Sequence, residues 1–154
     1  MRRLPLVLPA RRLHVVGGLL VPDSSPPSSL SAARIADELP QAEAAIQRHA
    51  VQSPRPLFRS PFGAWDAELL NGVGSAGYGW TVLWDLDTID WKPISDGGPT
   101  AEQIIAKVLS GAQGGSIVLM HLGGHETLEA MPGIVDGLLA LGYSLVTLQR
   151  LIGP

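Results

Sequence analysis

The sequence contains no cysteine, which excludes disulfide bonds, cysteine-ligated zinc sites and thiol nucleophiles together. It is also poor in charge: 16% of its 154 residues are charged, and the net charge is -3. Nucleic acids bind through basic surfaces, so we expect no nucleic acid partner. No apolar run approaches the roughly 20 residues that a membrane-spanning helix needs, so we also expect no transmembrane segment.

Proline is common, and most of the 13 prolines precede Phe62. We predict that residues 1–29 form an irregular Pro/Ser-rich lead-in, with one short strand over Val15–Val21 as the alternative. The basic start is followed by an apolar stretch that contains two prolines and ends at Arg11. A secretory signal needs an uninterrupted apolar segment, so we find no convincing signal peptide and leave the compartment unassigned.

From residue 30 onward, segments with helical spacing alternate with short apolar runs. The predicted helices are Ser31–His49 with a bend at Pro40, Asp66–Ala76, a helix opening at the capping-box pair Thr100 and Gln103, and Thr127–Leu141. The predicted strands are Leu57–Phe58, Trp80–Leu86, Ser116–His121 and Leu145–Leu148. We expect the Trp80–Leu86 run to be buried on both faces. The alternation predicts an α/β fold with a parallel sheet.

Polar residues follow three of the predicted strands. Arg59 comes after the first, Asp87 and Asp90 after the second, and His121 at the end of the third. In α/β folds, chemistry gathers at the carboxyl ends of parallel strands. A cation, two carboxylates and an imidazole on one rim therefore predict a site for acid–base chemistry.

Each of these residues also has a purely structural interpretation. Asp87 and Asp90 are typical turn residues ahead of Lys92-Pro93. His121 could be a buried histidine whose ring is hydrogen-bonded to the backbone. Arg59 could be a surface residue in a Pro-rich turn. The convergence of all four on one rim favours the functional interpretation.

Three ordered segments resemble motifs of the polysaccharide deacetylase family, the NodB-homology carbohydrate esterases. Residues 59–62 read R-S-P-F and match the family's third motif, R-x-P-[F/Y]. Residues 87–91 read D-T-I-D-W and match the fourth, D-x-x-D-W. Residues 119–121 read L-M-H and match the fifth, L-x-H. The resemblance covers most of the chain beyond residue 30.

The resemblance implies a partial, distorted (β/α) barrel without its first strands, formed by residues 30–152. Family members are hydrolases of carbon–nitrogen bonds other than peptide bonds, and they remove acetyl groups from sugar polymers such as chitin or peptidoglycan. Some members remove O-acetyl groups instead. The expected partner is thus a polysaccharide, and the expected cofactor is a divalent metal, zinc or similar, which activates water and holds the oxyanion. Family members often act outside the cell or in its envelope.

The resemblance also implies roles for individual residues. His121 would be the general acid that protonates the departing amine, and Asp90 would orient it. Arg59 would hold the catalytic-base carboxylate by a charge-assisted hydrogen bond, and Asp87 is the other carboxylate of the fourth motif. The residues expected to line the substrate groove or acetyl pocket are Pro61, Phe62, Trp91 and Leu119.

The departures from the family pattern concern the metal and the base. The first motif, T-F-D-D-G, needs an Asp-Asp pair, and this chain contains none. The second, H-x-x-x-H, is absent ahead of residue 30. His121 and His125 have that spacing, but Gly123 and Gly124 lie between them, so we assign no metal ligand in this chain.

We therefore expect a family chain that lacks its first strands, through a displaced start or a shifted reading frame, and that is inactive or impaired as written. The alternatives are a non-catalytic carbohydrate-binding remnant and a non-functional fragment. Neither the polymer nor the oligomeric state follows from the sequence.

Overall fold

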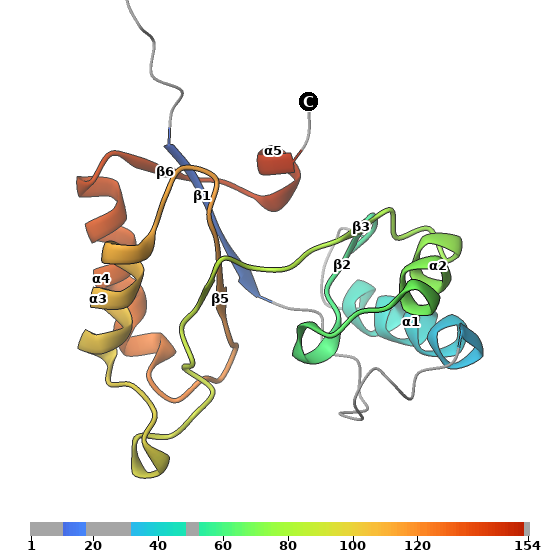
Figure 1. Cartoon of the computed structure of the whole chain (residues 1–154), viewed down its shortest axis with the longest axis horizontal. Coiled ribbons are helices and arrows are strands. Elements are labelled where there is room, and N and C mark those ends of the chain that lie inside the picture. Colours follow the sequence, from blue (N-terminus) through green and yellow to red (C-terminus); the bar gives the residue numbers. More distant parts are fainter. Residues whose placement is uncertain (1–10, 18–31, 49–52, 153–154) are drawn as a thin grey trace, which may run out of the picture. The chain divides into compact units, whose positions relative to one another are not determined.

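The computed structural model describes residues 11–17, 32–48 and 53–152 (Figure 1). The chain divides into two compact units, and each is described by itself. One combines residues 1–17 with 84–154, and the other spans residues 18–83. We call them the sheet unit and the helical unit.

A parallel four-stranded sheet forms the sheet unit, in the order β4-β5-β1-β6. Its strands are β1 (Arg11–Gly17), β4 (Leu86–Asp87), β5 (Ile117–Met120) and β6 (Tyr143–Leu145). Strand β1 pairs with β5 on one side, Val15 opposite Val118, and with β6 on the other, Leu13 opposite Leu145. Because β4 and β5 are parallel and adjacent, their carboxyl ends meet at one edge of the sheet.

Two helices lie side by side along one face of this sheet (Figure 1): α3 (Ala101–Gly111) and α4 (Thr127–Ala140). A short helix, α5 (Leu148–Ile152), lies against β1. The 3-10 turn η3 (Ile94–Asp96) precedes α3. The core between sheet and helices is apolar, and its buried members are Ala101, Ile104, Val108, Val118, Met120, Ala130, Ile134, Leu138 and Tyr143.

Helices α3 and α4 approach closely because α4 carries two glycines one turn apart. A Cβ added at Gly133 would lie 2.6 Å from Cδ1 of Ile105, and one at Gly137 would lie 2.6 Å from Cδ1 of Leu109. The two α3 side chains are likewise one turn apart. The pair of glycines therefore forms a groove that receives a ridge of α3.

The helical unit contains α1 (Ala32–Gln47), β2 (Leu57–Phe58), η2 (Pro61–Gly63), α2 (Ala67–Ser75) and β3 (Trp80–Thr81). Strands β2 and β3 form a separate parallel pair. Asp66 caps α2, since its carboxylate accepts a hydrogen bond of 2.8 Å from the main-chain N–H of Leu69. The core of this unit is formed by Leu39, Phe58, Leu69, Val73 and Tyr78.

Most predicted elements are confirmed to within a few residues. All four predicted helices are present, and Pro40 lies inside α1 as expected. The capping box also forms: the Gln103 N–H donates to Oγ1 of Thr100, and the Thr100 N–H donates to Oε1 of Gln103. The predicted α/β class with parallel strands is confirmed, and the partial (β/α) fold is taken up again below with the solved structures.

The prediction of one buried strand over Trp80–Leu86 is wrong. The run splits into β3 and β4, which belong to different sheets, and the boundary between the two compact units falls inside it. Trp80, expected in the core, is 53% exposed. Beyond this boundary the chain joins the four-stranded sheet: the carboxylate of Asp85, just before β4, accepts a hydrogen bond of 2.7 Å from the N–H of Ile117 in β5. A single apolar run can thus contribute two short strands to two different sheets.

Two other segments differ from expectation. The last strand is Tyr143–Leu145 rather than Leu145–Leu148, because the chain turns at once into α5 at Leu148. Within the expected irregular lead-in, Arg11–Gly17 forms β1. This strand pairs on both of its edges, and that tertiary pairing offsets weak local strand signals. The remaining lead-in residues lie outside the described ranges, and the boundary at residue 30 stays a prediction.

Among the described residues, no helix is both long and apolar enough to span a membrane.

We expect Gly137→Val to lower the free energy of unfolding by about 1–3 kcal/mol, because the new side chain overpacks the contact with Leu109. Gly74→Val is the matched control, since a Cβ at Gly74 of α2 meets nothing within 4 Å. That variant should change stability by less than about 0.5 kcal/mol. Urea unfolding followed by circular dichroism measures both, and equal effects would show that the α3–α4 contact is not close.

Candidate active site

The predicted residues of the fourth and fifth motifs meet at the carboxyl edge of the sheet. In the parallel register of β4 and β5, Asp87 lies opposite Leu119. The next residues of both strands, Thr88–Asp90 and His121, leave the sheet at the same edge. The sheet register thus accounts for the proximity of Asp90 and His121.

The chain turns sharply between β4 and Asp90. The N–H of Ile89 donates to the carboxylate of Asp87 at 2.9 Å, and the buried Thr88 donates from Oγ1 to the carbonyl of Leu119 at 2.9 Å. Ile89 itself has a φ of 60°, in the left-handed region that β-branched residues rarely adopt. This turn places Ile89 partly in solvent and buries Asp90.

Asp90 is 1% exposed, and its carboxylate is surrounded by donors. Its Oδ2 accepts from the main-chain N–H of His121 at 2.9 Å and from the hydroxyl of Thr127. Its Oδ1 lies 2.7 Å from Nδ1 of His121. Burial alone would raise the pKa of this carboxyl, but the hydrogen bonds from His121 and Thr127 outweigh burial, and the pKa is lowered.

This geometry assigns the orientation of the imidazole. An ionised carboxylate only accepts hydrogen bonds, so Nδ1 of His121 must carry the proton that faces Oδ1 of Asp90. Nε2 is then the ring nitrogen that Asp90 does not contact. The His121 side chain is 30% exposed, so the ring is partly accessible while its partner is buried. An oriented, accessible imidazole of this kind can transfer protons at Nε2.

The other predicted residues of this edge have different surroundings. Asp87 makes the turn contact with Ile89, which is the structural alternative left open for it by the sequence. Leu119 is 3% exposed and lies within β5. Trp91, next to Asp90, is 55% exposed. The catalytic role of Asp87 and the substrate-binding roles of Trp91 and Leu119 stay predictions.

The third-motif residues lie in the helical unit. Arg59 follows β2 and is half-buried, and Pro61 begins η2. Phe62 has a φ of 56° and is 72% exposed. The structure therefore brings His121 and Asp90 together within one unit, whereas the participation of Arg59, Pro61 and Phe62 stays a prediction.

The functional contact that the sequence did not reveal is that of Thr127. Its position in the sequence indicates only the start of a helix, although its hydroxyl donates to Asp90. A threonine six residues after a candidate histidine has no spacing signature, because the loop between them sets its position. Gly124, in that same loop, is recognisable from the sequence only as a residue that disfavours helix.

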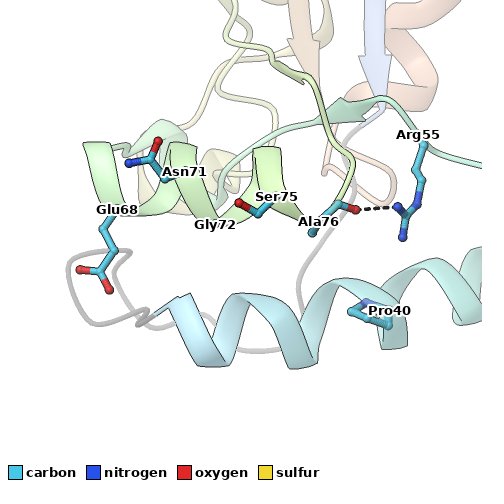
Figure 2. A pocket seen from close by; sticks show the side chains of 7 residues that line it. All are labelled: Pro40, Arg55, Glu68, Asn71, Gly72, Ser75 and Ala76. Carbon is cyan, nitrogen blue, oxygen red and sulfur yellow. Dashed lines mark hydrogen bonds between the residues drawn. The ribbon is translucent and has the colours of Figure 1, made fainter.

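A hollow of about 780 Å³ lies elsewhere, between α1 and α2 of the helical unit (Figure 2). Its lining residues are Pro40, Arg55, Glu68, Asn71, Gly72, Ser75 and Ala76. None of these belongs to the predicted site residues. Size alone does not make this hollow the candidate site, because its lining contains no residue of the three matched motifs.

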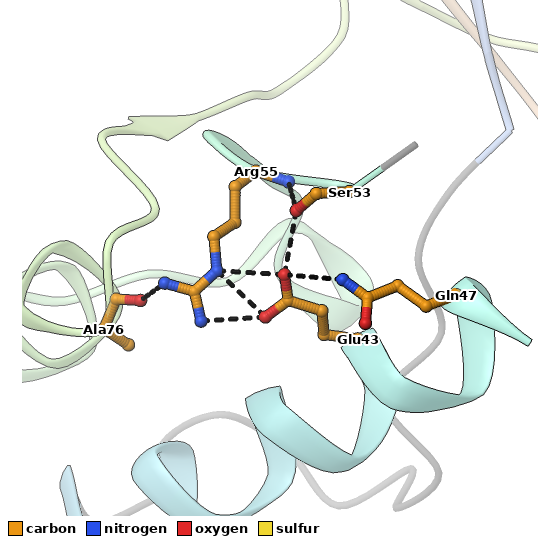
Figure 3. Close-up of polar contacts among 5 residues, drawn as sticks. All are labelled: Glu43, Gln47, Ser53, Arg55 and Ala76. Atoms are coloured by element: carbon orange, nitrogen blue, oxygen red, sulfur yellow. Dashed lines mark hydrogen bonds and ion pairs between the residues drawn. The ribbon is translucent and has the colours of Figure 1, made fainter. Parts of the chain in front are cut away.

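Arg55 at the edge of this hollow belongs to a polar network (Figure 3). Its guanidinium donates to Glu43 of α1 at 2.8–3.1 Å and to the carbonyl of Ala76 at the end of α2. Hydrogen bonds from Arg55 and Ser53 lower the pKa of Glu43. The guanidinium also lies 5.0 Å from the ring centre of the buried Tyr78. Arg55 therefore links α1 and α2 to the core of the helical unit and contributes to its structure.

Within the described ranges, no three His, Asp or Glu side chains are grouped closely enough to hold a metal ion. His125, which has the H-x-x-x-H spacing with His121, is bound through its main chain, since its N–H donates to the carbonyl of Asp90 at 2.8 Å. In the part of the chain that the structure describes, the residues do not fit the metal that the resemblance implied.

Comparisons with known proteins bear on this site. No family model matches the chain. Curated relatives that match include the chitooligosaccharide deacetylase of Azorhizobium caulinodans, 34% identical over 102 residues, and the peptidoglycan-N-acetylglucosamine deacetylase of Bacillus cereus, 36% identical over 101 residues. The matches cover 57% and 62% of this chain but only 46% and 45% of the relatives. The chain thus spans less than half the length of either.

Two solved structures extend the likeness to the fold. One is a family 4 acetyl xylan esterase from Clostridium thermocellum in complex with a cobalt ion (TM-score 0.71, 32% identity, 84% of this chain and 60% of that one). The other is a family 4 carbohydrate esterase pseudoenzyme from Bacillus anthracis (TM-score 0.67, 28% identity, 80% and 41%). The chain is homologous to the carboxy-terminal part of the NodB-type polysaccharide deacetylases. The expected partial α/β barrel fold is confirmed.

We expect acid to destabilise the protein partly through Asp90. Because its folded-state pKa is lowered, its charge contributes stability above the unfolded pKa of about 4, and this contribution disappears as the pH falls through the folded value. Asp90→Asn should lose about 2 kcal/mol near pH 6 and show a flatter decline between pH 6 and 3. Urea unfolding at several pH values measures this decline.

Asp136→Asn, at an exposed position of α4, is the matched control for Asp90→Asn and should retain the acid dependence of the wild type. An Asp90→Asn variant with the wild-type decline would contradict the assignment of a stabilised Asp90 carboxylate.

Proposed function

We propose that this chain serves in the deacetylation of an N-acetylated sugar polymer of the chitin or peptidoglycan type, with His121 as the proton donor. The observation that supports this proposal most directly is the Asp90–His121 pair. The buried carboxylate of Asp90 binds Nδ1 of His121 and leaves Nε2 for proton transfer. The names of the two curated relatives support the substrate class.

The chemistry requires such a donor. When an acetyl group leaves a sugar nitrogen, the carbon–nitrogen bond breaks only if the nitrogen is protonated, because an amide anion is a very poor leaving group. Asp90 holds the imidazole in one orientation, and Nε2 of His121 delivers the proton to the departing amine. The partly exposed ring and the exposed Trp91 beside Asp90 support access by a large substrate.

The activation of water is a separate requirement that this chain's described residues do not meet. Solved relatives, one of them with cobalt, support dependence on a divalent metal in the family. The metal and base motifs of the family are absent from this sequence, and the described residues offer no group of side chains to replace them. We therefore propose that the chain by itself is inactive or strongly impaired in acetyl hydrolysis.

A second candidate is non-catalytic binding of the same polymers. The 55% exposed Trp91 favours it, because aromatic faces stack on sugar rings. The pseudoenzyme among the solved structures is consistent with this candidate. The two candidates share a binding surface and differ in whether His121 has a role as a proton donor.

Acetate release from N-acetylglucosamine oligomers, with added zinc or cobalt, tests the proposed impairment. We expect rates at background for the wild type and for His121→Ala alike, because water activation is lacking. Metal-dependent turnover in the wild type that is lost in His121→Ala would contradict the proposed impairment and identify an active enzyme.

Binding can be measured without turnover, by NMR signals of the Trp91 indole and the His121 ring. We expect N-acetylglucosamine oligomers to shift both and Trp91→Ala to weaken binding about tenfold. Trp65→Ala, at a similarly exposed tryptophan of the helical unit, is the matched control. Acetylated oligomers that shift neither signal would contradict the proposed function.

A further inference from the structure

We propose that Thr127 is a positioning residue for His121, acting through the carboxylate of Asp90. The inference deepens the proposed function, in which His121 delivers a proton, and rests on it for its significance. Its basis is that the Thr127 hydroxyl donates to the far oxygen of the carboxylate that holds the ring.

The two oxygens of Asp90 have different partners. Oδ2 accepts both the Thr127 hydroxyl and the main-chain N–H of His121, the latter at 2.9 Å. Oδ1 faces Nδ1 of the His121 ring at 2.7 Å. Two donors on one oxygen prevent the carboxylate from rotating, so the other oxygen stays directed at the ring.

The Thr127 hydroxyl is not used to cap its helix. The cap residue of α4 is Glu126, which makes no side-chain capping hydrogen bond. In α3, by contrast, the Thr100 hydroxyl accepts the Gln103 N–H in a capping box. The two threonines thus differ in their contacts: the Thr100 hydroxyl caps its helix, whereas the Thr127 hydroxyl binds Asp90.

The loop ahead of α4 is shaped to allow this contact. A Cβ at Gly124 would lie 2.7 Å from Oδ2 of Asp90 and would collide with the Thr127 hydroxyl as well. Only glycine leaves both groups in place without movement. Positions 124 and 127 are therefore both fitted to the Asp90 carboxylate.

The consequence for His121 is a fixed tautomer. With Oδ1 held toward Nδ1, the neutral ring carries its proton on Nδ1, and Nε2 is the nitrogen that gains and delivers a proton. Without the Thr127 hydroxyl, the Asp90 carboxylate can turn and the ring can carry its proton on Nε2 more often. The ratio of the two tautomers is therefore a direct measure of the positioning role.

The experiment uses the full chain labelled with ¹⁵N at histidine, with His121 signals identified by their loss in His121→Gln. In the wild type we expect the neutral ring to be mainly Nδ1-protonated. Thr127→Val should lower the ratio of Nδ1–H to Nε2–H about tenfold, as expected for a lost hydrogen bond to a charged group. Thr127→Ser keeps the hydroxyl and should return the ratio to within about twofold of the wild type.

Thr100→Val is the matched control: it removes a helix cap and should lower stability without changing the His121 tautomer ratio. If Thr127→Val does not fold, Gly124→Ala tests the same contact by displacing the hydroxyl, and it should lower the ratio too. A wild-type ratio in the folded Thr127 or Gly124 variant would overturn the proposal. The tautomer measurement needs no substrate, so the two proposals can fail separately. If the tautomer depends on Thr127 as expected but the oligomers do not bind, the proposed function is refuted and the positioning role stands.

Discussion

The burial of one charged group, the carboxylate of Asp90, is the constraint on which the candidate site depends. An ionised carboxylate removed from water must be matched by donors, and the structure supplies them from two other segments. The main chain and ring of His121 come from the end of β5, and the hydroxyl of Thr127 comes from the first turn of α4. Satisfying one buried charge therefore positions both ends of the loop between β5 and α4. The orientation of His121 follows from the same set of contacts.

Local rules predicted that Asp90 and His121 lie at the same edge of the sheet, whereas their pairing was implied by the resemblance to the deacetylase motifs. Short strands ending in Asp87-Thr88-Ile89-Asp90 and in His121 are recognisable from composition, and parallel pairing brings their carboxyl ends together. Thr127 could not be predicted in the same way, since its contact depends on the path of a loop. The split of the Trp80–Leu86 run and the pairing of β1 also depend on partners distant in sequence. Local patterns specify elements, whereas pairing specifies which sheet an element joins.

The conformation of Ile89 shows a second limit of local reasoning. A β-branched residue favours extended backbone, yet Ile89 has a φ of 60°, which costs about 1–2 kcal/mol for a residue with a Cβ. The turn contacts of Asp87 and Thr88 hold the chain in this conformation. The same turn leads from β4 to Asp90, which is buried and accepts hydrogen bonds from His121 and Thr127. These hydrogen bonds help to offset the cost of the Ile89 conformation.

The contacts of the Asp90–His121 pair all lie between residues 87 and 127 of one compact unit. Their geometry is thus separable from the metal and base motifs that the family carries elsewhere in its sequence. An Asp90–His121 pair with this geometry is compatible with full activity, with impaired activity and with binding alone, because orienting a proton donor and activating water are different tasks. One solved structure with a similar fold is described as a pseudoenzyme. Turnover must therefore be judged from water activation, whereas the tautomer of His121 reports on how Asp90 orients the ring.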